Sequence, residues 1–527
     1  MKFGIDFGTT NTAVCVMRPN GPVALSFGQA GPAQTYVPSV LAVQTGAHPK
    51  EYLGMAAKMR IGETLPNLSV YQNFKMLLGE TPSVVAKHWA NHPLSPEQVT
   101  RKYIEGLIRQ IKDEHQLTPQ SVVVTVPEVW IAQGLLTKRE HLIESFKHQG
   151  IANVRTESEP LAAASYYLHK YREHKKADYQ GHLLVCDCGG GTMDFCLLRI
   201  ESGENHKPRM TVLERAGNGI VDGKLGSAGV AFDQTMVDRL FPGLKPGNAA
   251  EFHKRVREFE ERKIAFTEDV AELLKLHRSD PSLVEGDVLF EVAGHAVEAK
   301  PLAQVFDELI APDIHRALQQ LTQRLGSYTI NVNDPKQFRV LMVGGFSMFY
   351  LVQEAICRHF GSVATEDQRF ENLFTLQDRA LAIAKGAALI ANDLTEIVHT
   401  CPANVGVVAL ALDADKEQSE YCCILQKGIK ISQYKNPVYD NGQFKILKLD
   451  DELPIYLEPI PDKPITLNLK GHTLQSVLPS GIGVGATLEL GFSLDENLVF
   501  SLHVRDANRK SKTRVTTLGN LMARIPA

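Results

Sequence analysis

Residues 3–16, FGIDFGTTNTAVCV, run from an apolar strand into an aspartate, a Gly/Thr-rich turn and a second apolar strand. The same order returns in residues 184–198, LVCDCGGGTMDFCLL. When Asp6 is aligned with Asp187, both copies carry a glycine two residues later and hydroxyl groups in the turn. Two copies this far apart indicate a duplicated domain rather than a solenoid of short repeats.

A single turn of this kind is well explained as a tight β-hairpin in which glycine supplies a positive φ. Two copies with matched aspartates favour a phosphate site, because successive backbone N–H groups in such a turn form a nest for phosphate oxygens. An aspartate beside bound phosphates requires a cation, and Mg²⁺ typically contacts one or two carboxylates while keeping several waters. We therefore expect Asp6 and Asp187 to face each other across one polyphosphate and its Mg²⁺.

The composition is that of an ordinary globular protein. The 527 residues suffice for three or four folding units at ~100–200 residues each. The net charge of −4 argues against a nucleic-acid partner, because such proteins usually carry a basic excess. The N-terminus lacks a signal-peptide pattern, and no apolar run reaches the ~20 residues of a membrane span. The eight cysteines show no zinc-binding spacing, so we expect buried thiols in a reducing cytoplasm.

Alternating strands and helices divide the chain into two α/β halves and a β-rich tail. Strand-like segments such as residues 121–127, SVVVTVP, alternate with helical ones such as residues 97–115. This alternation predicts sheets covered by helices. From about Cys401 the pattern becomes strand-like, and residues 487–506 indicate a β-hairpin with one buried face. The expected fold is α/β with a lobe at 1–180, a second lobe at 181–392, a linker at 393–400 and an antiparallel β-sandwich-like domain at 401–527.

Seven segments carry a further resemblance. They are GIDFGTTNT (4–12), QNFKMLLGE (72–80), VVTVP (123–127), ESEPLAAASYY (157–167), CDCGGGTMD (186–194), EERKIAFT (260–267) and VLMVGGFS (340–347). In this order they resemble the DnaK-type heat-shock chaperones of the seventy-kilodalton class, within the actin, hexokinase and heat-shock ATPase superfamily. The resemblance implies duplicated actin-like ATPase lobes around a nucleotide cleft.

The resemblance also implies a role for each matched residue. Asp6 and Asp187 would hold hydrated Mg²⁺, with K⁺ as a further candidate ion beside ATP or ADP. The catalytic residues implied are Lys75, Glu159, Asp187, Thr192 and Asp194. The nucleotide-binding residues implied are Gly8, Thr9, Thr10, Asn11, Gly189, Gly190, Gly191, Thr192, Gly229, Glu260, Lys263, Thr267, Gly344, Gly345 and Ser347. Such parts suit phosphoryl transfer, in which positioning and electrostatics carry most of the catalysis.

The chain departs from the family pattern mainly at the adenosine end. Met348 stands where the family has the arginine that stacks on adenine. Residues 227–233, SAGVAFD, lack two acids of the matching family segment, and the acid expected before GAA is displaced, with Asp378 the nearest. The tail resembles the family's peptide-gripping β-sandwich more weakly, so we expect a divergent member without the helical lid.

The resemblance predicts an ATP-dependent chaperone of the cytoplasmic stress response. It would hydrolyse Mg-ATP slowly and couple this to the binding of unfolded or apolar polypeptide segments. Co-chaperones and nucleotide-exchange factors are further expected partners, whereas nucleic acid and membranes are not. Two alternatives stay open, a sugar or acid kinase of the same superfamily and a scaffold that binds nucleotide but barely hydrolyses it.

Overall fold

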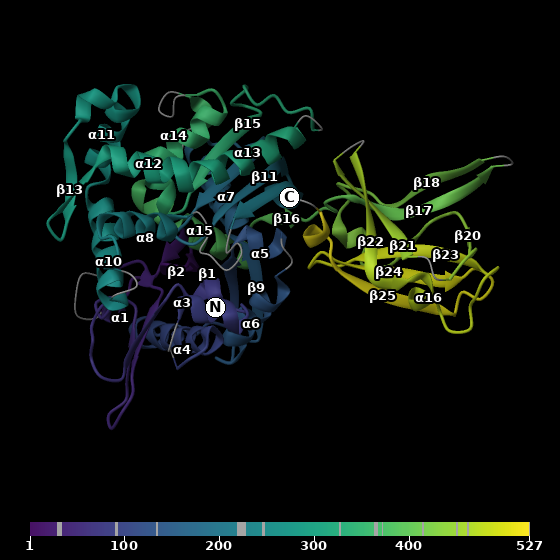
Figure 1. Cartoon of the computed structure of the whole chain (residues 1–527), viewed down its shortest axis with the longest axis horizontal. Helices are drawn as coiled ribbons and strands as arrows, with labels where there is room; N and C mark the ends of the chain where they lie inside the picture. Colours follow the sequence, from purple (N-terminus) through teal and green to yellow (C-terminus); the bar gives the residue numbers. More distant parts are fainter. Residues whose placement is uncertain are drawn as a thin grey trace.

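The computed structural model contains two α/β lobes and a β-rich tail that extends to one side of them (Figure 1). This arrangement confirms the predicted fold class. The structure describes all residues except 29–33, 90–92, 133–134, 219–227, 245–247, 326–327, 363–366, 371–372, 414–415, 450–451, 461–462 and 526–527.

The first lobe is built on a mixed sheet. The strand order is β3-β2-β1-β8-β9, with β4 paired to β2, and β1 runs antiparallel to β2 but parallel to β8. Phe3, Ile5 and Phe7 are buried in the core of this lobe, because alternate residues of a strand face the same side. The strands are β1 (Lys2–Phe7), β2 (Asn11–Arg18), β3 (Gly21–Ala24), β4 (Val37–Pro38), β8 (Ser121–Val126) and β9 (Asn153–Ser158).

The second lobe repeats this arrangement. Its strand order is β15-β10-β11-β12-β16, and β10 runs antiparallel to β11 but parallel to β15. Strands β10, β11, β12 and β15 therefore correspond to β1, β2, β3 and β8, which confirms the predicted duplication. The strands are β10 (Gly181–Cys188), β11 (Met193–Ser202), β12 (Pro208–Asn218), β15 (Phe338–Val343) and β16 (Glu396–Val398).

Two helices cross between the lobes, and each covers the sheet of the other lobe. Helix α7 (Glu159–Lys175) follows the first sheet and packs on β10, β11 and β12. Helix α15 (Leu376–Ala391) follows the second sheet and packs on β1 and β2. Gly386 of α15 lies against Ala162 of α7, so closely that a Cβ at Gly386 would overlap the Ala162 carbonyl. The crossing therefore joins the two lobes tightly beneath the turns of β1-β2 and β10-β11.

Further helices and two small sheets complete the lobes. The first lobe adds the sheet β6-β5-β7, and the second adds the hairpin β13-β14. Helix α4 shows why these segments are helical, because Ser95 and Gln98 form a capping box at its start and its apolar face is buried. The strands are β5 (Val40–Gln44), β6 (Lys50–Leu53), β7 (Leu68–Gln72), β13 (Val288–Val292) and β14 (His295–Glu298). The helices are α1 (Met55–Lys58), α2 (Phe74–Leu77), α3 (Pro82–His88), α4 (Pro96–His115), α5 (Glu128–Ala132), α6 (Leu136–Lys147), α8 (Gly229–Leu240), α10 (Ala249–Ala265), α11 (Thr267–Ser279), α12 (Ala299–Leu309), α13 (Ala311–Leu325) and α14 (Tyr350–His359).

The tail consists of two antiparallel sheets that share one apolar core. The predicted hairpin is confirmed as β23 and β24, with Phe492 opposite Leu502 and Leu494 opposite Phe500, all four buried. The strand orders are β18-β17-β21-β22 and β19-β23-β24-β25, with β20 on β23. The elements are β17 (Asn404–Asp413), β18 (Lys416–Leu425), β19 (Val438–Tyr439), β20 (Phe444–Lys445), β21 (Glu452–Ile460), β22 (Lys463–Thr473), α16 (Leu474–Val477), β23 (Thr487–Leu494), β24 (Val499–Asp506) and β25 (Thr513–Asn520).

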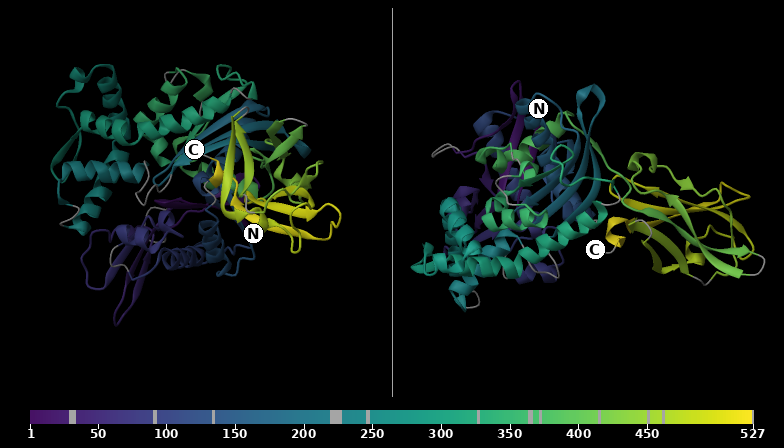
Figure 2. Two further views of the ribbon diagram at one scale, coloured as in Figure 1. Left: turned by 45° about the vertical axis from the view of Figure 1, so that its right-hand side comes forward. Right: turned by 90° about the horizontal axis from the view of Figure 1, so that it is seen from above.

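The tail joins the second lobe at the edge of its sheet. Residues 396–398, within the segment predicted as the linker, form β16 and pair in parallel with β12. Figure 2 shows the tail as a separate body beside the two lobes. Strand β12 is thus shared between the second lobe and the chain that leads into the tail.

The structure also bears on the expectations about membrane-spanning segments and about the cysteines. Within the described ranges, no helix is both long and apolar enough to cross a lipid bilayer. All eight cysteines are free thiols, and six of them are buried.

Candidate functional site

The two Gly/Thr-rich turns lie against each other between the lobes. Each is closed by one backbone hydrogen bond, from Gly8 N to Asn11 O in the first turn and from Gly189 N to Thr192 O in the second, both 3.0 Å. A Cβ on Gly190 would lie 2.7 Å from Cγ2 of Thr10 in the opposite turn. The sequence placed these turns on either side of one site, and the structure brings them together.

The turns form one wall of a cleft of about 400 Å³. Most of the residues that the resemblance implied line this cleft. They are Asp6, Gly8, Thr9, Thr10, Asn11, Lys75, Glu159, Asp187, Gly189, Gly190, Gly191, Thr192, Gly229, Glu260, Lys263, Thr267, Gly344 and Gly345.

Ser347 and Asp194 are the two implied residues that do not line the cleft. Ser347 is 2% exposed and donates a hydrogen bond of 2.7 Å to the carbonyl of Gly344, so it shapes the loop. Asp194 is fully buried on β11, where its Oδ1 accepts a hydrogen bond of 2.9 Å from the backbone N–H of Val129. Gly344 has φ +86° and passes so close to Asp187 that a side chain there would collide with the carboxylate.

Lys75 and Glu159 form a buried ion pair at the base of the turns. Nζ of Lys75 lies 2.5 Å from Oε1 of Glu159, and the two side chains are 2% and 9% exposed. Lys75 comes from α2, whereas Glu159 is the first residue of α7. The pair therefore ties the start of a crossing helix to the floor of the cleft.

Glu159 and three aspartates, Asp6, Asp187 and Asp194, influence one another at this site, and Lys75 opposes the rise in pKa at Asp6 and Asp187. Burial raises the pKa of Asp6 to about 7, helped by the charge of Glu159 and opposed by Lys75. Burial also raises the pKa of Asp187 well above its ordinary value, and Glu159 and Asp194 add to that rise. The pKa of Asp194 is raised by burial and then by Glu159. Without a ligand, burial and the neighbouring carboxyl groups therefore disfavour the ionisation of all these acids together.

The residues present fit a hydrated divalent cation. Oδ2 of Asp194 is buried and has no hydrogen-bond partner among the described residues, so the protein leaves one acceptor at the site unsatisfied. In the part of the chain that the structure describes, no three His, Cys, Asp or Glu side chains are grouped to ligate a metal directly. Mg²⁺ usually touches one or two carboxylates and keeps several waters, which suits Asp6 and Asp187.

The residues implied at the ribose and adenine are engaged with other side chains. Nζ of Lys263 lies 2.5 Å from Oδ1 of Asp233, and burial raises the pKa of Asp233 to about 6. Oε2 of Glu260 lies 3.0 Å from Nζ of Lys58, which comes from the first lobe. These ion pairs hold α10 against α8 and against the first lobe, while both residues still line the cleft.

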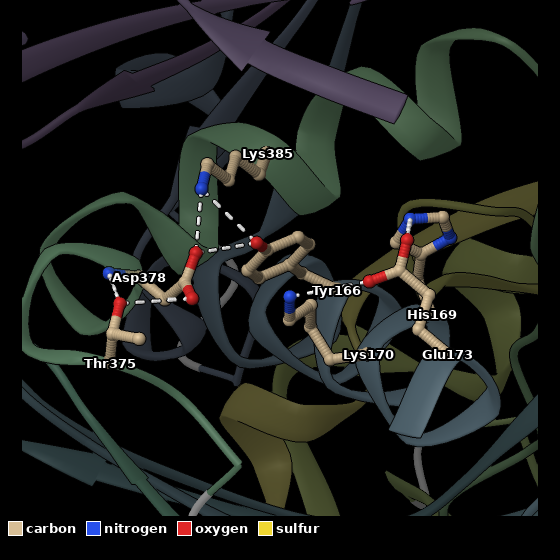
Figure 3. Close-up of polar contacts among 7 residues, drawn as sticks. All are labelled: Tyr166, His169, Lys170, Glu173, Thr375, Asp378 and Lys385. Atoms are coloured by element: carbon tan, nitrogen blue, oxygen red, sulfur yellow. Dashed lines mark hydrogen bonds and ion pairs between the residues drawn. The ribbon is translucent and has the colours of Figure 1, made fainter. Parts of the chain in front are cut away.

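Asp378 is not among the residues that line the cleft, and its carboxylate lies instead in a cluster of polar contacts (Figure 3). Its Oδ1 accepts hydrogen bonds from Tyr166 Oη at 2.6 Å and Lys385 Nζ at 2.7 Å, while its Oδ2 accepts one from Thr375 Oγ1 at 3.0 Å. These hydrogen bonds and the charge of Lys385 lower the pKa of Asp378 to about 2, against the opposing effect of burial. The carboxylate therefore fastens α15 to α7. The cleft face of this helix turn carries Arg379, which lies beside Met348.

A buried network that the sequence analysis missed connects the cleft to the tail. Oε2 of Glu128 accepts a hydrogen bond of 2.5 Å from Ser158 Oγ, directly before Glu159. Oε1 of Glu128 pairs with Arg215 of β12, and Arg215 Nη2 lies 2.9 Å from Nδ1 of His399. Burial lowers the pKa of His399 to about 3, and the charge of Arg215 adds to this, so its neutral ring accepts the hydrogen bond.

Two sequence signals could have found this network. Glu128 is an acid placed almost directly after the apolar strand 121–126, and Arg215 is one of three charged residues in the mixed segment 208–218. Burying a charge is costly unless an opposite charge lies nearby. If Glu128 and Arg215 were buried, each would therefore need a partner of opposite charge. A second ion pair, of 2.7 Å between Lys427 of the tail and Glu214, lies beside it.

A model of the protein family described as Hsp70 protein matches residues 2–412, well over half of the 527 residues. Proteins of that family are ATP-binding chaperones with an actin-like ATPase domain. They bind ATP or ADP, typically with Mg²⁺ and K⁺, and they generally bind substrate polypeptides and co-chaperones. The match contains both turns, the cleft and the strand that leads into the tail, and the chain therefore belongs to the Hsp70 family.

Proposed function

We propose that this chain binds Mg-ATP in the cleft, hydrolyses it slowly, and uses the change to alter how its tail holds unfolded or apolar polypeptide in the cytoplasm. The observation that carries the proposal is the meeting of two phosphate-type turns with Lys75, Glu159 and Asp187 at their base. Eight free thiols suit a reducing compartment.

Each group would contribute by position and charge, as is usual for phosphoryl transfer. The backbone N–H groups of both turns would donate to phosphate oxygens, with Thr9, Thr10 and Thr192 adding hydroxyl donors. Mg²⁺, held through water by Asp6 and Asp187, would neutralise phosphate charge. Lys75 would orient the attacking water near the terminal phosphate, and Glu159 would hold the Lys75 ammonium in place.

Asp194 would complete the catalytic groups as the proton acceptor. Burial raises its pKa, its Oδ2 has no hydrogen-bond partner in the described part of the chain, and its Oδ1 accepts a hydrogen bond from Val129 N of the first lobe. A carboxyl group whose pKa is raised towards the working pH is a better general base than an ordinary aspartate.

The link to the tail would run through the network of Glu128, Arg215 and His399. Ser158 connects this network to Glu159 at the cleft, and Val129 connects it to Asp194. A change in lobe closure would alter the support of β12 and of the chain leading into the tail. ATP can shift such an equilibrium only if it binds the two arrangements with different affinity.

The test is single-turnover hydrolysis of Mg-ATP, combined with melting in Mg-ATP, in Mg-ADP and without nucleotide. Nucleotide should raise the melting temperature, because a ligand of the native state stabilises it by mass action. Lys75→Ala should abolish turnover while the ligand-free protein still melts cooperatively. Lys102→Ala is the matched control, because Lys102 is an exposed lysine paired with Glu51.

A chain that shows no melting shift at millimolar nucleotide would contradict the proposal as a whole. A melting shift without turnover would favour the nucleotide-binding scaffold. For the tail, the measurement is binding of a permanently unfolded model polypeptide in Mg-ATP and in Mg-ADP. Equal affinity in both nucleotides would contradict the coupling.

One observation favours a sugar or acid kinase as a second candidate function. A separate pocket of about 180 Å³ adjoins Thr9, Lys75 and Thr192. Trp130 and Lys138 also line it, and a small acceptor could occupy it beside a terminal phosphate. ADP production that depends on a sugar or a carboxylic acid would support this candidate, whereas production that no small molecule stimulates would remove it.

A further inference from the structure

We infer that Arg379, at the start of α15, is the residue that binds the nucleotide base, with its guanidinium stacked on the adenine ring. The inference rests on the proposed binding of ATP and adds to it a residue that determines base affinity. It concerns the end of the cleft where Met348 replaces an arginine of the family pattern.

Few of the N–H donors of the Arg379 guanidinium have a good acceptor among the described residues. Arg379 lies on the wall of the cleft, where Nη1 donates to Sδ of Met348 at 3.4 Å. A thioether sulfur is a weak acceptor. Nε of Arg379 is buried and has no hydrogen-bond partner among the described residues.

The charge of Arg379 is also unbalanced among the described residues. The carboxylate nearest in sequence, Asp378, is engaged by Tyr166, Thr375 and Lys385 (Figure 3). Burial alone lowers the pKa of Arg379, with no neighbouring acid to oppose it. A half-buried cation without a partner is costly, so a ligand that covers it would be favoured.

The surroundings of Arg379 favour a flat base over a phosphate. Met348, Ala380 and Ile383 line the cleft beside it and present apolar surface. The phosphate-type turns already provide two sets of N–H groups together with Lys75. A guanidinium is planar and stacks on aromatic rings, which a nucleotide base offers and a phosphate does not.

The cluster in Figure 3 also explains why Arg379 is held in place. The Thr375 hydroxyl caps α15 by accepting a hydrogen bond of 3.1 Å from Asp378 N, and the Asp378 carboxylate is tied to α7. Because the residue before Arg379 is fixed on both sides, the first turn of α15 cannot rotate freely. With its backbone fixed, only the side chain of Arg379 has to be ordered on binding, which lowers the entropy cost.

The experiment measures binding of Mg-ADP and of Mg-tripolyphosphate by titration calorimetry. Arg379→Ala should weaken Mg-ADP binding by roughly 5- to 30-fold, the range of a partly desolvated cation–π contact. Binding of tripolyphosphate should stay within about twofold, because it has no base. Arg379→Lys should recover only part of the loss, because lysine keeps the charge without the planar surface.

Two further variants guard against a merely structural effect. Arg358→Ala is the matched control, since Arg358 is 69% exposed and paired with Glu354, and it should bind ADP as the wild type does. The exchange Met348→Arg with Arg379→Met should restore much of the ADP affinity, because the two side chains touch. Ligand-free Arg379→Ala should melt no lower than the wild type, since the substitution removes a half-buried charge that no described acid balances.

The outcomes separate this inference from the function on which it rests. Unchanged ADP affinity in Arg379→Ala, or an equal loss of tripolyphosphate affinity, would overturn the inference while ATP binding stands. A wild type that binds neither ligand would overturn the proposed function and this inference together.

Discussion

The two copies of the duplicated unit share their hairpins but differ in the strand that follows. In the first lobe, β3 is a short strand of four residues, and Val23 on it is 45% exposed. In the second lobe, the corresponding β12 has eleven residues and carries the buried Arg215 and Glu214. The third strand of the unit is therefore short and partly exposed in the first copy. In the second copy it is long, and its charged residues contact the chain that leads into the tail.

The two copies also differ in the number of carboxyl groups that their hairpins contribute to the site. The first hairpin contributes only Asp6, which accepts a hydrogen bond from Thr125 Oγ1 at 3.3 Å. The second contributes Asp187 and Asp194: burial raises the pKa of both, Glu159 adds to both rises, and Asp194 adds to that of Asp187. The Gly/Thr-rich turn is common to both copies, whereas the second copy has the two buried aspartates and continues into β12.

The largest expected effect comes from breaking the connection at β12. Arg215→Ala leaves Glu128 buried and unpaired, which should cost about 3–5 kcal/mol of stability. Val23→Ala, at the equivalent strand of the first lobe, should stay within about 0.5 kcal/mol because the position is exposed. Chemical unfolding followed by tryptophan fluorescence and circular dichroism measures both changes.

A second substitution shows whether the cost belongs to the pair. The double variant Glu128→Gln with Arg215→Met removes both charges, so it should be more stable than Arg215→Ala alone. If Arg215→Ala were as stable as the wild type, strands β3 and β12 would contribute equally little to stability, and the comparison of the two copies would fail.

The next largest expected effect is a difference in hydrolysis rate between variants of the two cleft aspartates, Asp187 and Asp6. Asp187→Asn should lower single-turnover hydrolysis by roughly 10²–10³-fold, the size expected when one electrostatic group of a catalytic site is lost. Asp6→Asn should lower it by about 10–100-fold, since it would act mainly by orienting water on the cation. Equal losses in the two variants would argue that the copies contribute equally.

The third prediction uses pH, because Asp6 and His399 respond to it with opposite signs. The folded pKa of His399 is about 3, below its value of ~6.5 in an unfolded chain. The unfolded chain therefore takes up the proton first, and stability falls as pH drops from ~6.5 towards 3 by about 1.4 kcal/mol per pH unit. His399→Gln should flatten the fall of melting temperature between pH 6 and pH 5.

Asp6 provides the opposite case in the ligand-free protein. Its folded pKa is about 7, above its unfolded value of ~3.9, so its protonated form stabilises the fold at low pH. That stability is lost as pH rises through 7. Asp6→Asn should therefore gain stability relative to the wild type between pH 6 and pH 8, and a constant difference across this range would contradict the assigned pKa.

Local patterns in the sequence were enough to predict the duplicated turns, the α/β lobes and the β23-β24 hairpin, because a strand and its turn are encoded by neighbouring residues. The ion pairs of Glu260 and Lys263 could not be predicted in this way. Lys58 lies in the other lobe, and only the closure of the lobes brings it to Glu260. Ser347 matched a motif by position, yet its hydroxyl serves the loop itself, which depends on a turn geometry that the motif does not specify.

The smallest expected effect compares the caps of the two crossing helices. Ser158 caps α7 and Thr375 caps α15, and each hydroxyl accepts a backbone N–H of its own helix. Replacing either by alanine should cost about 0.5–2 kcal/mol. Ser158→Ala should lie at the upper end, because Ser158 also donates to Glu128, and its loss leaves a buried carboxylate oxygen without a donor. Thr375→Ala also loses a hydrogen bond to Asp378, but that carboxylate keeps Tyr166 and Lys385.

Melting of the two single variants measures the difference in stability between them. A larger loss for Thr375→Ala would mean that the helix of the second lobe, rather than the network leading to the tail, carries the stability of the crossing.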